Sequence, residues 1–367
     1  MKRRIAWVII GIALLSFASC SSLGYYWQAM RGQLEISTKQ RPIADWLAGD
    51  SLDANTRGQL ARSAEIRAFA SRELGLPDNQ SYRSYADLGR PYVLWNVFAA
   101  PEFSNELLQS CFPVAGCVTY RGFFAEQKAR AYGDEMQRQG HDTYVGGVPA
   151  YSTLGWFNDP VLNTFIQYPE AELARLIFHE LAHQVVYVKD DSTFNESFAT
   201  AVEEEGIKRW IAARGAGTLA TPANADELVQ QWRRGNERRA QFRSMVARYR
   251  EQLAALYAEA IANESKRQRK ARIFAALKSE YERLVQSWGE STSRSSWLKD
   301  ELNNAHLASV ATYTELVPAF HALLARQGGD LRAFYAEVKT VAGTAKTQRL
   351  ATLEGLLPSA ALAPVQK

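Results

Sequence analysis

The sequence predicts a mainly α-helical protein with a small β-sheet, an α+β fold. Amphipathic segments with apolar residues at helical spacing dominate the first half of the chain, at Tyr25–Ser37, Thr56–Leu74 and Phe124–Gln139. Strand signals are few, and they lie in short runs bounded by turn residues at Tyr92–Phe98, Cys117–Arg121 and Thr143–Ala150. These runs precede two neighbouring helical segments near residues 176–200, so we expect a small sheet lying across those two helices.

The first residues have the pattern of an export signal. Residues 1–4 are basic after the initiating methionine, Ile5–Phe17 is apolar, and the small residues Ala18 and Ser19 stand before Cys20. A leader of this kind is removed from the folded protein, so residues 1–19 are assigned to a signal peptide. The alternative is an uncleaved anchor, although the apolar run is short for a membrane-spanning helix.

Composition and charge narrow the classes of partner. The chain of 367 residues carries 43 basic and 39 acidic residues, and 47% of its residues are hydrophobic. Loss of the leader removes Lys2, Arg3 and Arg4 and leaves a net charge of +1. A nearly neutral, plainly globular chain indicates no polyanionic partner such as a nucleic acid.

Two cysteines lie close together in the middle of the chain. Cys111 and Cys117 form an even pair once Cys20 is set aside. In an exported protein such a pair favours a disulfide that closes a short loop. The alternative, two ligands of a separate structural zinc site, lacks two further Cys or His residues nearby.

The segment Leu176–Gln184 contains the pattern His-Glu-x-x-His, which places two imidazoles and a carboxyl group within five residues. A spacing of four residues puts His179 and His183 on one face of a helix, so both imidazoles can reach one ion. Glu180 then stands next to the place of an activated water. This pattern is typical of zinc peptidases, with two metal ligands and a general base.

A catalytic zinc ion usually takes three ligands from the protein, so a third is needed. Glu196 is the best candidate, because it opens a second helical segment after the polar turn Lys189–Ser192. A helix, a tight reversal and a second antiparallel helix would bring Glu196 back beside His183. We expect Asn195, Thr200 and Glu203 near the ligands as hydrogen-bond partners of the imidazoles.

The same residues also have an ordinary structural interpretation. His179 and His183 could be core histidines, and Glu196 could be an acid that the helix dipole favours in a first turn. The helix around the histidines is apolar nearly all round, however, which implies burial. Two buried imidazoles beside a buried carboxyl group need a partner, and a metal ion meets that need.

The stretch Leu228–Trp288 predicts two long helices that form an antiparallel hairpin. Its apolar residues recur every three or four positions, and Asn263–Lys266 is the expected tip. Its many basic residues indicate a solvated helical face; the sharper alternative is contact with anionic lipid or a partner protein. The predicted organisation is therefore 1–19 signal peptide, 20–222 helices, sheet and zinc-binding helices, 223–290 hairpin, and 291–367 helices completing the catalytic domain.

Several blocks of sequence resemble known families. Asn195, Glu196 and Ala199 match the Asn-Glu-x-x-Ala pattern of the gluzincins, and small residues before Cys20 resemble the lipobox of bacterial lipoproteins, with Phe17 where Leu is usual. The blocks 20–29, 111–124, 147–160 and 303–313 look like a family of bacterial zinc aminopeptidase lipoproteins. This resemblance covers essentially the whole mature chain.

The resemblance implies a function and a location. It implies one Zn²⁺ ion held by His179, His183 and Glu196, and peptide hydrolysis with Glu180 as general base. The expected donor to the reacting carbonyl is Tyr313, with His306 as the second and Tyr151 as the third candidate. It also implies an acyl chain on Cys20 and, because Ser21 follows, sorting to the outer membrane facing the periplasm. Peptide substrate is then the expected partner, with the membrane reached through the lipid.

Substrate recognition departs from the better-known aminopeptidases of this group. They bind the free amine through a Glu in a Gly-Ala-Met-Glu-Asn segment, whereas this chain has Gly146, Gly147 and, further on, Tyr151 at a similar distance. We expect this segment to bind the peptide backbone. The amine would need another acid, and the candidates are Asp159, Glu203 and Glu204. Two alternatives stay open: a zinc endopeptidase, and a non-catalytic tethered chaperone or scaffold with a structural zinc.

Overall fold

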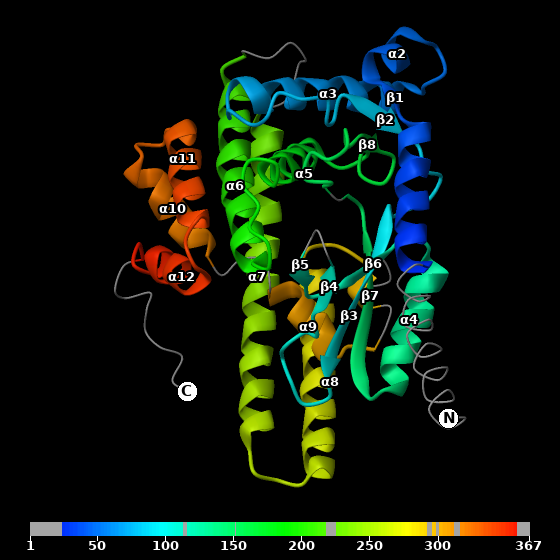
Figure 1. Ribbon diagram of the computed structural model, residues 1–367, viewed down its shortest axis with the longest axis vertical. Helices are drawn as coiled ribbons and strands as arrows, with labels where there is room; N and C mark the ends of the chain where they lie inside the picture. Colours follow the sequence, from blue (N-terminus) through cyan, green and yellow to red (C-terminus); the bar gives the residue numbers. More distant parts are fainter. Residues whose placement is uncertain are drawn as a thin grey trace, which may run out of the picture.

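The computed structural model describes residues 24–112, 116–150, 152–217, 225–291, 296–298, 301–311 and 316–357. Over these residues the protein is mainly helical with small sheets, as the sequence predicts (Figure 1). None of the helices in the described part of the chain has the length and hydrophobicity needed to cross a membrane. The expected signal peptide and Cys20 lie outside the described residues.

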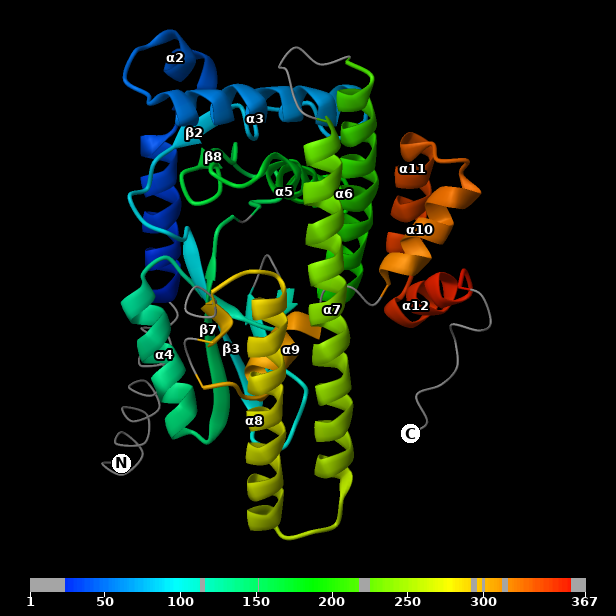
Figure 2. The ribbon, with the colours of Figure 1, turned by 180° about the vertical axis from the view of Figure 1, so that it is seen from behind.

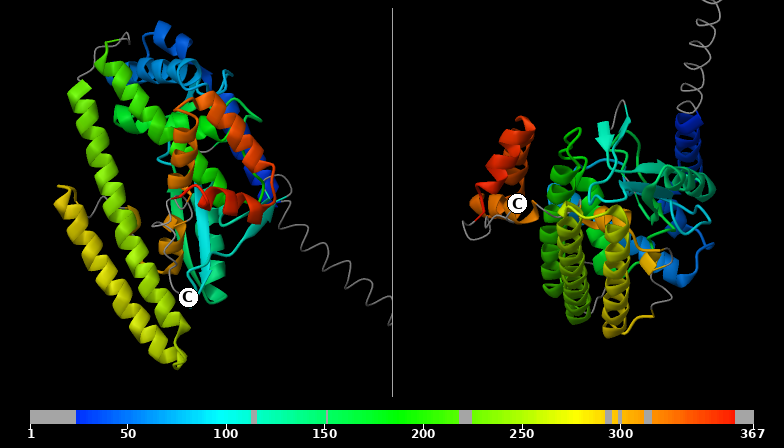
Figure 3. Two further views of the ribbon diagram at one scale, coloured as in Figure 1. Left: turned by 90° about the vertical axis from the view of Figure 1, so that its left-hand side faces the viewer. Right: turned by 90° about the horizontal axis from the view of Figure 1, so that it is seen from below.

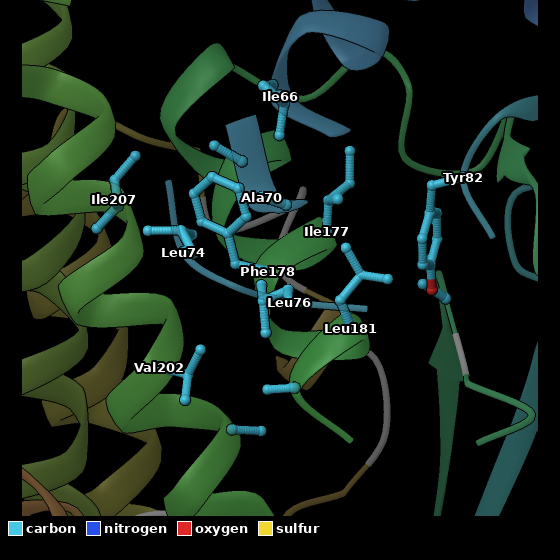
Figure 4. Packing of buried hydrophobic residues seen from close by; sticks show 14 of the residues in the cluster. Ile66, Ala70, Leu74, Leu76, Tyr82, Ile177, Phe178, Leu181, Val202 and Ile207 are labelled. Atoms are coloured by element: carbon cyan, nitrogen blue, oxygen red, sulfur yellow. The ribbon is translucent and has the colours of Figure 1, made fainter. Parts of the chain in front are cut away.

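Three helices form the scaffold of the molecule: α3 (Ala54–Arg72), α5 (Glu170–Ala182) and α6 (Ser192–Gly215). Phe178 of α5 is fully buried between residues of α3 and α6, as Figure 4 shows. A Cβ atom on Gly206 would lie 2.7 Å from the Phe178 ring. Only a glycine therefore lets α5 and α6 approach this closely.

A three-stranded antiparallel sheet stands beside these helices. Its central strand is β3 (Leu94–Pro101), between β6 (Arg121–Phe123) and β7 (His141–Val148), and α4 (Glu126–Arg138) packs on it. The single strand predicted over residues 117–121 is wrong. Its residues fall in two sheets, because β5 (Gly116–Val118) pairs with β4 (Ser110–Phe112), whereas β6 pairs with β3.

Smaller elements complete this half of the molecule. A disulfide joins Cys111 to Cys117 across β4 and β5. The helix of residues 24–39, called the N-terminal helix below, runs beside the sheet in blue (Figure 1). A second small sheet joins β1 (Arg41–Pro42), β2 (Ser84–Ala86) and β8 (Val161–Leu162), with α2 (Ile43–Ala48) after β1.

The long hairpin is present, with its tip earlier than expected. It consists of α7 (Ala225–Ala258) and α8 (Asn263–Ser287), so the tip is 259–262 and the predicted tip forms the first turn of α8 (Figure 2). Its own apolar cluster also includes Trp297 of the short 3₁₀ helix η2 (Ser296–Leu298) and Leu307 of α9 (Asn304–Ala311).

The expected solvated basic face is only partly correct. Three basic residues of the hairpin reach acids of the main body, in the ion pairs Arg239–Glu172, Arg267–Glu102 and Lys270–Asp142. These pairs dock the hairpin on α5 and on the β3–β7 sheet.

Three C-terminal helices lie on the outer side of α6: α10 (Val317–Arg326), α11 (Leu331–Ala342) and α12 (Lys346–Glu354) (Figure 3). Phe320 of α10 packs edge-on against Phe194 and Phe198 of α6. One continuous core extends from Ile36 to Leu353 and joins these helices to the scaffold. The domain boundaries expected from the sequence stay a prediction.

Candidate metal centre and cavity

The end of α5 and the start of α6 bring the candidate ligands together. His179 lies in the last turn of α5, His183 caps that helix, and Glu196 lies in the first turns of α6. Asn195 fixes the turn between the helices, because its side chain accepts from the backbone N–H of Val188 and donates to the Val188 carbonyl, both at 2.7 Å. The sequence therefore predicts the reversal correctly.

The side chains of these three residues converge on one point. The Nε2 atoms of His179 and His183 are 3.2 Å apart. The Glu196 carboxylate lies 3.3 Å from the first imidazole and 3.7 Å from the second. All three candidate ligand atoms lie within 4.8 Å of one another.

This arrangement fits a zinc ion. Tetrahedral zinc with bonds of about 2.0–2.1 Å to nitrogen and oxygen separates its ligand atoms by roughly 3.3 Å. With its ring proton on Nδ1, each imidazole presents Nε2 as an acceptor beside the carboxylate, so the three converging acceptors need a cation between them, either a proton or a metal ion. His183 Nδ1 is buried and unpaired among the described residues. The donor set of two nitrogens and one oxygen is one that zinc favours.

Glu203 lies behind the ligands, where the sequence predicts a supporting acceptor. It stands two turns beyond Glu196 on α6, and its Oε2 is 3.0 Å from His179 Nδ1. That bond makes Nδ1 the donor and leaves Nε2 free to bind a cation. Arg175 pairs with the other oxygen of Glu203. Although burial raises the pKa of Glu203, Arg175 and His179 outweigh it and lower that pKa to about 2.

The imidazoles respond to these neighbours in opposite directions. Burial lowers the pKa of His179, but its hydrogen bonds to Glu196 and Glu203 raise that pKa well above its ordinary value. Burial lowers the pKa of His183 to about 4. A proton on His179 occupies the position that a cation would take, so cation binding at this site is expected to release a proton.

Asn195 and Thr200 were expected to hold the imidazoles, and the structure gives Asn195 another role. The side-chain amide of Asn195 forms both of its hydrogen bonds with the backbone of Val188, and among the described residues it does not bond to either histidine. Thr200 is buried on α6. Of the three expected partners, only Glu203 bonds to a candidate ligand.

Glu180 faces a cavity of about 560 Å³ that also contains the three candidate ligands. Burial raises the pKa of the Glu180 carboxyl to about 7, and repulsion from Glu196, Asp159 and Glu203 adds to this effect. A carboxyl group with such a pKa can accept and return a proton near neutral pH. The cavity walls are rich in aromatic side chains, namely Tyr25, Tyr26, Phe112, Tyr120, Phe124 and Tyr187.

The predicted substrate-binding glycines do not line this cavity; their strand lines it with Val148 instead. A Cβ atom on Gly147 would lie 2.3 Å from the Tyr92 ring, and one on Gly146 would lie 3.1 Å from the Tyr144 ring. Tyrosine rings therefore pack closely on both glycines, and the role of these glycines toward substrate stays a prediction. Tyr151 and Tyr313 lie outside the described residues.

The other candidates from the sequence lie elsewhere. His306 is fully buried against the Tyr144 ring, away from the cavity lining, so its expected role as carbonyl donor is not supported. Asp159 accepts hydrogen bonds from Thr153, and Glu204 pairs with His321. Among the described residues, the acids that line the cavity are Glu180 and Glu196.

Tyr120 is a candidate functional residue that the sequence did not single out. It follows β5 and lines the cavity together with Glu180 and Glu196. Burial and the charges of Glu196, Tyr187 and Glu180 raise the pKa of its phenol, so it stays a hydrogen-bond donor. The only feature of the sequence that could have indicated Tyr120 is its position shortly after Cys117. That position predicts a place in the cavity only once the fold of the disulfide hairpin is known.

Fold and site define an α+β protein in which two histidines and a glutamate form a group that could hold a metal ion, next to a buried carboxyl group. The model of the family described as "Putative aminopeptidase" matches residues 24–353. The chain therefore belongs to that family. Searches of curated proteins and of solved structures gave no match.

Proposed function

We propose that the protein is a zinc-dependent peptidase of gluzincin type. Its family description indicates an aminopeptidase, which removes residues from the amino end of a peptide. The observation that carries the proposal is the convergence of His179, His183 and Glu196 beside Glu180 in one cavity. One Zn²⁺ ion is the proposed cofactor, and a peptide is the proposed substrate.

The residues of the cavity suit peptide hydrolysis. When bound, zinc would supply Lewis acidity, which makes a carbonyl more electrophilic and a water more acidic. Glu180 takes the proton of the attacking water on a carboxylate oxygen and later donates it to the leaving amine. Glu203 and Arg175 hold His179 in the required tautomer and orientation.

A donor is also needed for the negative charge that develops on the carbonyl oxygen. The Tyr120 phenol lies in the cavity and remains protonated at neutral pH, so it suits this role. Tyr313 keeps the role proposed from the sequence. Kinetics of Tyr120→Phe and Tyr313→Phe separate the two: the donor's variant should lose kcat with little change in KM.

Glu180→Gln tests the reaction directly. The variant should retain zinc and lose peptide cleavage by at least about 10²-fold, because removal of a general base costs about that much. Glu264→Gln, on the exposed start of α8, is the matched control and should behave like the wild type. Metal content is measured by elemental analysis. Equal cleavage by Glu180→Gln and wild type would rule out this mechanism.

A second candidate function, an endopeptidase, is favoured by one observation. The acids among the described cavity residues are Glu180 and Glu196, and both already have a role, which leaves no described carboxylate to bind a free amine. Matched peptides with free and acetylated amino ends separate the two activities. Faster cleavage of the free peptides supports the aminopeptidase; equal or faster cleavage of the acetylated ones supports the endopeptidase.

We also propose that the protein is an exported bacterial lipoprotein of the outer membrane that faces the periplasm. The basic, apolar and small-residue regions before Cys20 support this proposal, as does Ser21 after it. Metabolic labelling with a fatty acid should mark the wild type and not Cys20→Ala. Label on both proteins would contradict acylation at Cys20.

A further inference from the structure

The N-terminal helix exposes three large apolar side chains on the face that does not pack on the protein. The residues it buries at a spacing of four are Gln28, Gly32 and Ile36. On the opposite, outward face stand Trp27, Met30 and Leu34, which are 57%, 55% and 61% exposed. A surface helix normally shows the reverse pattern.

The buried face explains why this orientation is fixed. Gln28 accepts a hydrogen bond from the Phe124 backbone N–H at 3.0 Å, and a Cβ atom on Gly32 would lie 2.1 Å from the Phe124 ring. These two contacts seat the helix against the end of β6. The helix therefore cannot rotate to bury its outward face without losing them.

We propose that the outward face of this helix, defined by Trp27, Met30, Leu34 and the exposed Arg31, docks on the surface of a lipid bilayer. The described part of this helix starts at residue 24, four positions after Cys20 in the sequence, and the apolar run Ile5–Phe17 precedes that cysteine. Any lipid or apolar anchor in that stretch holds this face close to a bilayer. Tryptophan and arginine suit the boundary between head groups and acyl chains.

The same helix also forms part of the cavity. Tyr25, Tyr26 and Ala29 line the cavity that contains Glu180, and Tyr26 is 45% exposed as well. In Figures 1 and 2 the helix runs along the side of the molecule opposite to α10–α12, where no described element covers it. Docking of this helix therefore places one wall of the cavity at the bilayer.

A loop that shares the cavity exposes further aromatic residues. Leu154 lines the cavity, and Trp156 and Phe157 on the same loop are 75% and 53% exposed. Thr153 holds this loop through its hydrogen bonds with Asp159 and with the backbone of Phe157. On the proposed peptidase function, these features assign the substrates to peptides held at the membrane surface.

Co-flotation with vesicles of phosphatidylethanolamine and phosphatidylglycerol tests the docking surface. The mature chain carries Cys20→Ser, so that no acyl chain contributes to binding. This protein should float with the vesicles, and the triple variant W27S/M30S/L34S should bind at least about tenfold more weakly. The matched control I261S/L350S replaces two residues that are 36% and 41% exposed elsewhere, and it should bind like its parent.

Equal flotation of the triple variant and its parent would overturn the proposal. The proposal would also be overturned if the parent does not float but forms dimers in sedimentation and the triple variant does not. The outward face would then be an interface between two copies of the chain. The single variant L34S, with a circular dichroism spectrum identical to the parent's, should show a smaller loss in the same direction. It keeps the test valid if the triple variant fails to fold.

Activity distinguishes this proposal from the proposed function. The parent should cleave a vesicle-anchored peptide faster than the same peptide in solution, and the triple variant should lose only that advantage. Flotation without cleavage of either peptide would reject the peptidase and leave the docking surface standing. Equal cleavage of the anchored peptide by parent and triple variant would reject membrane-held substrates.

Discussion

The α5–α6 pair and the α7–α8 hairpin are both antiparallel helix pairs, but different forces hold them. At the end of α6 that faces the cavity, Asn195, Ser197, Thr200 and Glu203 are buried. In the described residues of the hairpin, by contrast, every buried side chain is apolar or a tyrosine. Polar groups are costly to bury unless they are hydrogen-bonded, so the packing of the first pair depends on its hydrogen bonds and ion pairs as well as on apolar contacts.

Ion pairs show the same contrast. Glu203 is 7% exposed and binds both Arg175 and His179. In the hairpin, Arg248 and Glu280 form a pair at the surface, with side chains 51% and 33% exposed. Buried pairs are costly to break, whereas exposed pairs contribute little. The following predictions test this difference.

Glu203→Ala should have the largest effect. It leaves Arg175 with only Glu172 and His179 without its supporting acceptor. Loss of one member of a buried pair costs about 3–5 kcal/mol, and loss of such support weakens zinc binding by about 10- to 100-fold. Urea unfolding and competition with a zinc chelator measure the two effects.

Arg248→Ala in the hairpin is the matched comparison, because it breaks the exposed pair and leaves Glu280 the hydrogen bond that it accepts from Tyr249. This variant should lose less than about 1 kcal/mol of unfolding free energy, and the loss should be smaller in high salt. Similar losses for the two variants would contradict the proposed contrast between the regions.

The stability of the folded protein should depend on pH through His306, which borders the hairpin's apolar cluster near Trp297. Burial lowers its pKa from the ordinary value of 6.5 to about 3. Between these values the folded protein keeps His306 neutral while the unfolded chain binds a proton, so the stability that this residue provides above pH 6.5 is lost as the pH falls. At pH 5 the loss amounts to about 2 kcal/mol.

Urea unfolding of wild type and His306→Gln between pH 7 and pH 4 checks this effect. The stability of the variant should fall less steeply with decreasing pH, whatever its stability at pH 7. Parallel curves would show that His306 titrates normally in the folded protein.

Local pattern predicts the parts of this molecule that depend on short spacing. The reversal that brings Glu196 beside His179 and His183 follows from two amphipathic helices and a short polar turn. The hairpin follows from apolar residues every three or four positions. Both depend on residues close in the sequence, where geometry leaves few options.

Features that depend on distant partners were not predicted. The strand expected at 117–121 splits because β5 pairs with β4 through the disulfide hairpin, while β6 pairs with β3. The close approach of Gly147 to the ring of Tyr92, far away in the sequence, was not predicted, and the role of Gly147 toward substrate stays a prediction. Tyr120 enters the cavity for the same kind of reason, because the fold of that hairpin decides where its phenol lies.

One glycine in each helix pair shows how tightly that pair is packed, because an added methyl group meets different neighbours in the two places. A Cβ atom on Gly206 of α6 would meet the Phe178 ring at 2.7 Å and Leu74 at 2.9 Å, both in the close-packed core. On Gly235 of α7 it would meet the Glu172 carboxylate at 2.9 Å, the end of a side chain that can shift slightly while keeping its pair with Arg239. The first contact cannot relax without shifting the helices, and the second can.

Gly206→Ala should therefore destabilise the protein by about 1 kcal/mol, near the lower end for an overpacked core. Gly235→Ala should leave stability unchanged or raise it by up to about 1 kcal/mol, because alanine favours a helix interior. Urea midpoints of both variants measure the difference. The opposite order would mean that α5 and α6 can separate more easily than α7 can adjust, and that the site stands on the softer of the two helix pairs.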